Sequence, residues 1–185
     1  SGNFGNLTAG LLAERMGLEV AAFVAATNAN DVVPQYLESG LFSARPSVAT
    51  LSNAMDVGNP SNFARIRHLF GGDLAAMRSR IRGFRASDEE TRQTIREVFE
   101  RTGYVLDPHT AVGYRALSAT PSAAGSASGI VLATAHPVKF REHVEPLIGR
   151  KIPIPHRLAE CLERPRRSLP LPPEEAALKT FLEGW

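Results

Sequence analysis

The sequence is poor in cysteine, lysine and long apolar runs. Cys161 is its single cysteine, so the chain can form neither an internal disulfide nor a cysteine metal cluster, and a reducing, cytoplasmic setting fits best. No apolar run approaches the roughly 20 residues that span a bilayer, and the mean hydropathy is −0.13, so we expect no membrane partner. The sequence begins with Ser1 and shows neither an initiator methionine nor a secretory signal.

The chain also lacks a marked excess of positive or negative charge. Lys and Arg number 21 against 19 Asp and Glu, which gives a net charge of +2, and this excess is too small to indicate a nucleic-acid partner. Only three of the basic residues are lysines, which limits the candidates for a reactive amine: Lys139, Lys151 and Lys179. Hydrophobic residues make up 43% of the 185 residues, enough for one domain, or one domain with an appendage.

The first six residues, SGNFGN, have the composition of an anion-binding loop. Gly2 and Gly5 let backbone N–H groups approach a ligand, and the helical pattern that follows adds free N–H donors and a positive dipole end. A tight turn with a helix cap is the simpler alternative. A phosphate loop of this kind normally follows a buried strand, and none precedes Ser1. We therefore expect the chain to be the C-terminal part of a longer protein.

The first half of the chain alternates helical and strand-like patterns, which predicts an α/β fold. We expect a helix over residues 6–17, a buried parallel strand over 19–27 and a short helix that ends at Gly40. Further along, Val48–Leu51 is strand-like, a helix begins at about Pro60, and residues 73–84 form another helix.

The second half carries clearer end signals. Ser87 and Glu90 form a capping box, Gly103 ends that helix, and Asp107 followed by Pro108 starts the next one. The buried face of the first of these helices is expected to hold Thr91, Ile95, Val98, Phe99 and Thr102. After these helices we expect a flexible small-residue loop over 121–128, a second buried strand over 129–137 and a helix over 137–149.

The composition changes near residue 150. We assign residues 1–149 to an α/β domain and residues 150–185 to a proline-rich tail that wraps across the surface. A last amphipathic helix carries Leu178, Phe181, Leu182 and Trp185.

Five blocks in this order resemble the threonine synthase family, pyridoxal-phosphate enzymes of fold type II. The blocks are SGNFGNLTAGLLAERMGL, ATNANDVVPQYLESG, SNAMDVGNPSNFARI, DPHTAVGY and LATAHPVKF. The resemblance covers residues 1–148 well and the tail loosely. It implies that the chain is part of a fold type II sheet with flanking helices and an extended tail.

The resemblance also implies a reaction and a set of site residues. The reaction converts O-phospho-L-homoserine and water to L-threonine and phosphate, with pyridoxal phosphate as an electron sink. Five residues would cradle the cofactor phosphate: Ser1, Gly2, Asn3, Phe4 and Gly5. Thr134 would bond the pyridine nitrogen, and Asn6 would face the substrate.

The resemblance places the Schiff-base lysine well upstream of the glycine-rich loop, outside this chain. No catalytic residue is therefore assigned here, and activity would require the missing N-terminal part. Lys139 is either a surface lysine in a first helical turn or a ligand of the anionic substrate. Arg65, with Ser61 and Asn62, is a similar candidate for the substrate phosphate, against the default of a helix-surface arginine.

Two histidines, His109 and His136, adjoin prolines at expected helix starts, where a cap or turn role is favoured over catalysis. We expect no metal. Three alternatives stay open: a related phospho-lyase that eliminates phosphate without hydrating the product, a non-catalytic fragment or interaction module, and a nucleotide-binding α/β domain. The last is disfavoured because no acidic residue follows the second expected strand at a ribose-binding distance.

Overall fold

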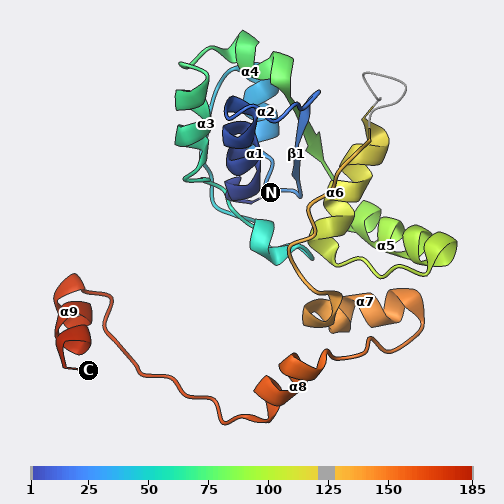
Figure 1. Ribbon diagram of the computed structural model, residues 1–185, viewed down its shortest axis with the longest axis vertical. Helices are drawn as coiled ribbons and strands as arrows, with labels where there is room; N and C mark the ends of the chain where they lie inside the picture. The colour runs from blue at the N-terminus through green and yellow to red at the C-terminus, as the bar shows by residue number, and fades with distance from the viewer. Residues whose placement is uncertain (1, 121–127, 185) are drawn as a thin grey trace. The chain divides into compact units, whose positions relative to one another are not determined.

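The computed structural model describes residues 2–120 and 128–184 (Figure 1). The chain divides into two compact units, residues 1–152 and 153–185. Ser1, Trp185 and most of the loop expected over residues 121–128 lie outside the described residues. The functional division at residue 150 remains a prediction.

The first unit contains most of the secondary structure. Its α-helices are α1 (Gly5–Arg15), α2 (Val32–Ser39), α3 (Phe63–Leu69), α4 (Leu74–Arg80), α5 (Asp88–Thr102), α6 (Pro108–Ala119) and α7 (Arg141–Ile148). Its strands are β1 (Phe23–Thr27) and β2 (Ile81–Arg85), and its 3-10 turns are η1 (Asn53–Met55) and η2 (Pro137–Phe140). The predicted α/β class is confirmed.

The two strands form a parallel sheet in which Phe23 pairs with Ile81 and Thr27 with Arg85. Strand β1 confirms the buried strand expected over 19–27. The helix expected over 73–84 ends early, because α4 stops at Arg80 and the chain continues as β2. Gly83 lets α2 pack closely on this strand, since a Cβ on it would lie 2.9 Å from the Cα of Pro34 in α2.

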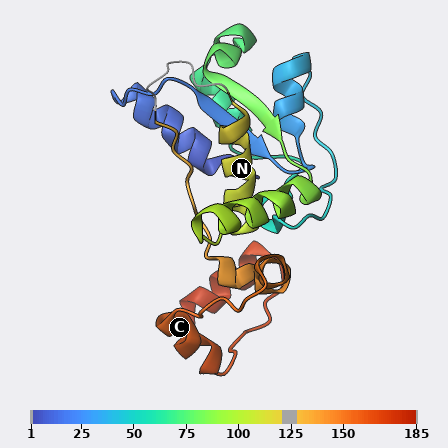
Figure 2. The ribbon, with the colours of Figure 1, turned by 90° about the vertical axis from the view of Figure 1, so that its right-hand side faces the viewer.

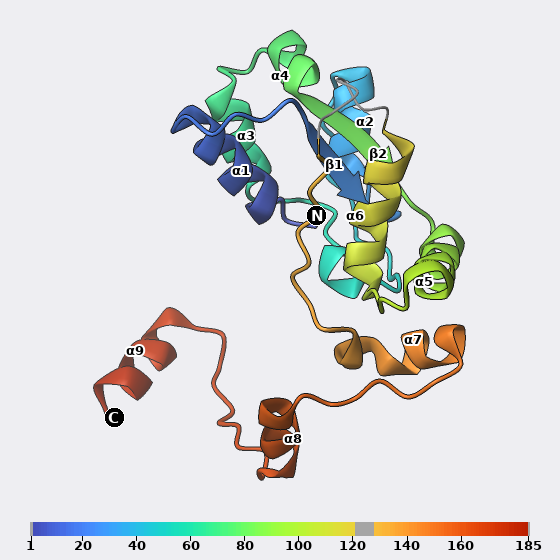
Figure 3. The same cartoon turned by 45° about the vertical axis from the view of Figure 1, so that its right-hand side comes forward.

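The sheet separates two apolar clusters, because successive side chains of β1 point to opposite faces. Ala25 packs with α1, α2, α3 and α4, in a cluster that includes Phe4, Leu11, Val33, Ile66 and Met77. Ala26 packs with Met55 of η1 and with Val112 and Ala116 of α6. Figure 2 faces the α5 and α6 side of this unit, and in Figure 3 α6 lies in front of the strands with α2 behind them.

Local end signals are confirmed where the sequence is explicit. Ser87 and Glu90 form both bonds of the capping box of α5, and Gly103 ends that helix with φ of 72°. Asp107 caps α6, accepting from the N–H groups of His109 and Thr110. On α5 the expected buried positions hold for Thr91, Ile95 and Val98, whereas Thr102 is exposed and Phe99 only partly buried.

Two expected strands are wrong. Residues 48–51 form no ladder, and residues 129–136 run without strand pairing before η2 begins at Pro137. A strand needs a neighbour for its backbone hydrogen bonds, and in the described part of the chain β1 and β2 pair only with each other. Residues 129–136 instead lie along α6, where Gly129 packs on Leu117, and the side chain of Ile130 is 82% exposed.

The second unit contains α8 (His156–Glu163), which was not predicted, and α9 (Glu175–Glu183), which confirms the expected terminal helix. Neither helix buries a residue. Among the described residues of both units, no helix combines the length and apolar character that crossing a lipid bilayer requires.

Candidate functional site

The N-terminal loop leads into α1 through a strained residue. Phe4 takes the left-handed conformation, with φ of 57°, and is the only non-glycine residue with positive φ in the described ranges. Its ring is 1% exposed and packs in the core, which holds this conformation in place. Among the described residues no side chain caps α1, so within that part of the chain the first-turn N–H groups from Gly5 onward have no side-chain acceptor.

Gly2 rests on the turn η1. A Cβ on Gly2 would lie 2.5 Å from the Cα of Met55 and 2.8 Å from the carbonyl oxygen of Ala54, so only glycine fits. Met55 is itself buried among the residues that join the sheet to α6. The loop is therefore seated on backbone, with its position set by η1.

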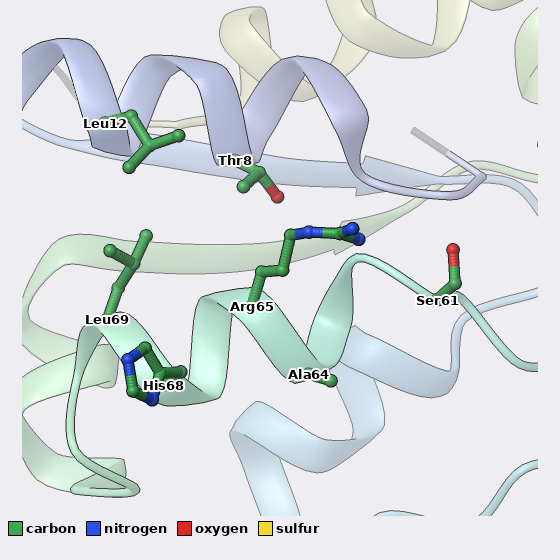
Figure 4. Close-up of a pocket in the computed structure, with 7 residues that line it drawn as sticks. All are labelled: Thr8, Leu12, Ser61, Ala64, Arg65, His68 and Leu69. Atoms are coloured by element: carbon green, nitrogen blue, oxygen red, sulfur yellow. The ribbon is translucent and has the colours of Figure 1, made fainter.

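Asn3 ties the loop to the chain before α3. Its side-chain oxygen accepts from the N–H of Ser61 at 2.6 Å and from the Ser61 hydroxyl at 3.1 Å, while its amide nitrogen donates to the same hydroxyl. Beside this contact α1 and α3 enclose a groove of about 620 Å³, shown in Figure 4. Its lining residues are Thr8, Leu12, Ser61, Ala64, Arg65, His68 and Leu69.

Arg65 extends into this groove between the two helices (Figure 4). Its guanidinium donates to the side-chain oxygen of Asn62 at 3.0 Å. Arg65 thus gives the groove a positive charge, with the hydroxyls of Thr8 and Ser61 on its walls. The Thr8 and Ser61 hydroxyls donate to the carbonyl of Phe4 and to Asn3, so it is the remaining N–H groups of Arg65 that can hydrogen-bond an anion entering from solvent.

A buried polar network follows the carboxyl end of β1, the edge of an α/β sheet where ligands bind. The side-chain nitrogen of Asn28 donates to Thr50, Ser52 and Asp56, the last at 2.8 Å. The side-chain nitrogen of Asn30 donates to Asn28 and to Asp56 at 3.0 Å. Because Asn28 and Asn30 are almost fully buried, these bonds fix the segment that leads into and out of η1.

A second polar connection reaches η1 from α6. The N–H of Ala54 donates to Nε2 of His109 at 3.1 Å, and Nδ1 of His109 lies 2.9 Å from Oδ1 of Asp107. The hydroxyl of Thr110 donates to the other oxygen of Asp107. Phe140 packs against the imidazole ring, with centroids 4.9 Å apart.

These contacts set the charge state of Asp107. Burial alone would raise the pKa of this carboxyl, but hydrogen bonds from the side chains of His109 and Thr110 and from the His109 N–H lower it below its ordinary value. Asp107 is therefore a buried carboxylate at neutral pH, fully engaged as a helix cap and as the partner of His109.

The structure brings together some of the predicted site residues. Gly2, Asn3, Phe4, Gly5 and Asn6 form one continuous turn at the start of α1, and the pair of Asn3 with Ser61 joins it to the groove that Arg65 lines. Ser1 lies outside the described residues.

Thr134 and Lys139 lie in the segment that follows α6. Thr134 is exposed and lies in the segment that was expected to form a buried strand over 129–137 but does not, and Lys139 is exposed in η2. Within the described part of the chain, no hydrogen bond joins either of them to the N-terminal loop. Their roles remain predictions.

Sequence reasoning missed the supports of the loop. Asn28, Asp56 and the His109 contact with Ala54 link segments that are 26 to 55 residues apart, and no local pattern reports such pairs. Of the two histidines expected in cap or turn roles, His136 caps η2, whereas His109 lies next to the predicted cap Asp107 and bonds to η1. The polar run TNAND directly after a buried strand was the one available signal.

The chain is similar to threonine synthases along its whole length. Residues 110–182 match the family described as "Threonine synthase, C-terminal". The threonine synthase of Serratia marcescens is 46% identical over 184 residues, which cover 100% of this chain and 42% of the relative.

Solved structures agree with this similarity. The crystal structure of threonine synthase from Escherichia coli matches with a TM-score of 0.84 and 44% identity, covering 100% of this chain and 42% of that one. The structure of PLP bound threonine synthase from Brucella melitensis gives a TM-score of 0.80 at 32% identity, covering 100% and 44%. The chain spans about two fifths of the length of the relatives that it matches.

Proposed function

The chain belongs to the threonine synthase family, and on that premise we propose that it is the C-terminal part of an enzyme that converts O-phospho-L-homoserine and water to L-threonine and phosphate. In this proposal it is a pyridoxal-phosphate-dependent carbon-oxygen lyase acting on phosphates, in threonine biosynthesis. Similarity over the whole chain, with a TM-score of 0.84 to a solved threonine synthase, is the observation that carries the proposal.

The start of α1 fits the phosphate of the cofactor. Its first-turn N–H groups have no side-chain cap among the residues that the structure describes, and the backbone changes hand between Phe4 and Gly5, which turns successive N–H groups toward one side. A phosphate there would accept hydrogen bonds from the loop and gain from the helix dipole. Ser1, Gly2, Asn3, Phe4 and Gly5 are the residues proposed to hold it.

When bound, pyridoxal phosphate supplies an electron sink that stabilises negative charge at the Cα and Cβ atoms of the amino-acid substrate. The chain's own contribution is binding and orientation. Asn3, held by Ser61, fixes the loop against α3, and Gly2 sits on η1 without a side chain. Thr134 is proposed to offer its hydroxyl to the pyridine nitrogen, which would leave that nitrogen largely unprotonated.

The groove between α1 and α3 suits the second phosphate of the reaction, which belongs to the substrate. Arg65 supplies a permanent positive charge at this groove, whereas the hydroxyls of Thr8 and Ser61 already donate to the carbonyl of Phe4 and to Asn3. Asn6, exposed in the first turn of α1, is proposed to face the substrate. Lys139 is a further candidate for binding the substrate anion.

The lysine that bonds the cofactor covalently is proposed to lie in the part of the protein that precedes this chain. The partners of the chain are then that N-terminal part and a small phosphorylated amino acid. A cytoplasmic setting belongs to the same proposal, because the single cysteine, Cys161, is an exposed free thiol.

Product stoichiometry tests the proposal. The full-length gene product, supplied with pyridoxal phosphate and O-phospho-L-homoserine, should release phosphate and L-threonine in equal amounts. Phosphate without threonine would support the phospho-lyase alternative. Neither product would support a non-catalytic module.

A further inference from the structure

We propose that His109, oriented by Asp107, is a positioning residue for the loop that holds the cofactor phosphate, acting through the turn η1. The inference deepens the proposed function and rests on it. His109 is not placed at the reacting atoms; it fixes the surface on which Gly2 lies.

The hydrogen-bond directions define the state of the His109 ring. A backbone N–H can only donate, so Nε2, at 3.1 Å from the nitrogen of Ala54, is the acceptor and carries no hydrogen. The hydrogen of the neutral ring is then on Nδ1, where it points at Oδ1 of Asp107 at 2.9 Å. Asp107 thereby selects the one tautomer that can accept from Ala54.

The bond to His109 connects the turn η1 to α6, which the hydrogen bonds within the turn do not do. Within η1 the N–H groups of Met55 and Asp56 bond to carbonyls of the same turn, at 2.8 and 3.0 Å. The N–H of Ala54 instead bonds to His109 of α6, which lies 55 residues further along the sequence. Since α6 is packed on the sheet through Val112 and Ala116, this bond fixes η1 relative to the sheet.

The position of η1 determines the position of the N-terminal loop, because Gly2 lies directly against η1. Gly2 is so close to the backbone of Ala54 and Met55 that no side-chain atom separates them. A shift of η1 by a few tenths of an ångström therefore moves or releases Gly2, and binding geometry of this kind tolerates only about 0.5 Å. No other imidazole in the described residues donates to a buried carboxylate while accepting from the turn beneath this loop.

Two substitutions separate the acceptor from the rest of the side chain. His109→Gln places an amide oxygen near the position of Nε2 and keeps an acceptor for Ala54. His109→Asn places an amide near Nδ1, keeps the partner of Asp107 and loses that acceptor. Both variants are made in the full-length gene product, prepared without cofactor.

The first measurement is hydrogen exchange at the Ala54 amide, by mass spectrometry with single-residue fragmentation. The Ala54 amide should be protected in the wild type and in His109→Gln. In His109→Asn it should exchange at least about 10-fold faster, because the Ala54 N–H then bonds only to water. The second measurement is the dissociation constant of pyridoxal phosphate. It should rise about 5- to 10-fold in His109→Asn and return close to the wild-type value in His109→Gln, consistent with the loss of one hydrogen bond.

The outcomes distinguish the two proposals. If the wild type does not bind pyridoxal phosphate, the proposed function fails, whereas the exchange result still reports on the turn. If the wild type binds and His109→Asn matches it in affinity, the positioning role is overturned. Should His109→Asn not fold, histidine-selective ¹⁵N NMR of the wild type decides, because a ring protonated on Nε2 contradicts the proposal and one protonated on Nδ1 supports it.

Discussion

A Cβ atom placed on Gly2 would lie 2.5 Å from the Cα of Met55, closer than real Cβ atoms approach backbone. Gly2→Ala must therefore displace either the loop or η1. We expect a loss of about 1–3 kcal/mol in the free energy of unfolding, as for other overpacked sites. Urea unfolding of the full-length protein measures it.

Gly5→Ala is the matched control for that prediction. A Cβ on Gly5 would meet only the side-chain nitrogen of Asn62, at 3.8 Å, and the position is helical. Its stability should stay within about 0.5 kcal/mol of the wild type or increase. Equal stability of the two alanine variants would show that the close contact of Gly2 is absent in solution.

Asn28 and Asp56 should tolerate substitution only when both are changed together, so that one amide still faces one carboxylate. Asn28→Asp removes the donor and sets two carboxylates against each other in a buried network, so we expect a loss of about 3 kcal/mol at pH 7. The double variant Asn28→Asp with Asp56→Asn restores one donor and one acceptor and should recover at least half of that loss. Additive losses in the double variant would contradict this account of the network.

Asp107 should give the stability of the protein a defined pH dependence. Its folded-state pKa is below the ordinary value of 3.8, so its carboxylate stabilises the fold above that pH, and the contribution is lost as the pH falls through the lower, folded-state pKa. Asp107→Asn keeps a cap-forming side chain and removes the charge. The stability difference between wild type and variant should be constant from about pH 5 to 7 and shrink toward pH 3.

Urea midpoints across this range measure the difference. A gap that widens on acidification would mean that burial, rather than hydrogen bonding, dominates the environment of Asp107. The same result would weaken the assignment of the Nδ1–H tautomer to His109.

The three lysines of the chain should react alike with pyridoxal phosphate. All are exposed, and none is proposed to bond the cofactor covalently. Borohydride treatment of the 185-residue chain with the cofactor should therefore give weak labelling of Lys139, Lys151 and Lys179, without a stoichiometric adduct. Peptide mapping checks this, and specific labelling of Lys139 would overturn the proposal that the reactive lysine precedes this chain.

Features determined by neighbours in sequence could be predicted. The caps at Ser87 and Asp107 and the helix ends at Gly40 and Gly103 were all assigned correctly, because each depends on residues within one helical turn. Strand β1 was recognisable as a continuous apolar run between helices.

Features determined by distant partners could not be predicted. Most of strand β2 falls within the predicted helix over 73–84. Its partner strand β1 lies 58 residues earlier in the sequence, and its exposed arginines interrupt the apolar pattern typical of a buried strand. Conversely, residues 129–136 have strand-forming side chains but no partner strand within the described residues. The supports of the loop, Asn28 with Asp56 and His109 with Ala54, were missed for the same reason.

In the proposed function, the turn at the start of α1 and the hydroxyl of Thr134 hold opposite ends of one pyridoxal phosphate. A crystal structure of the full-length gene product with the cofactor bound tests it most directly. We expect phosphate oxygens within hydrogen-bond distance of the backbone N–H groups at the start of α1, with the Thr134 hydroxyl on the pyridine nitrogen. A cofactor phosphate bound elsewhere, or a different partner on that nitrogen, would contradict it.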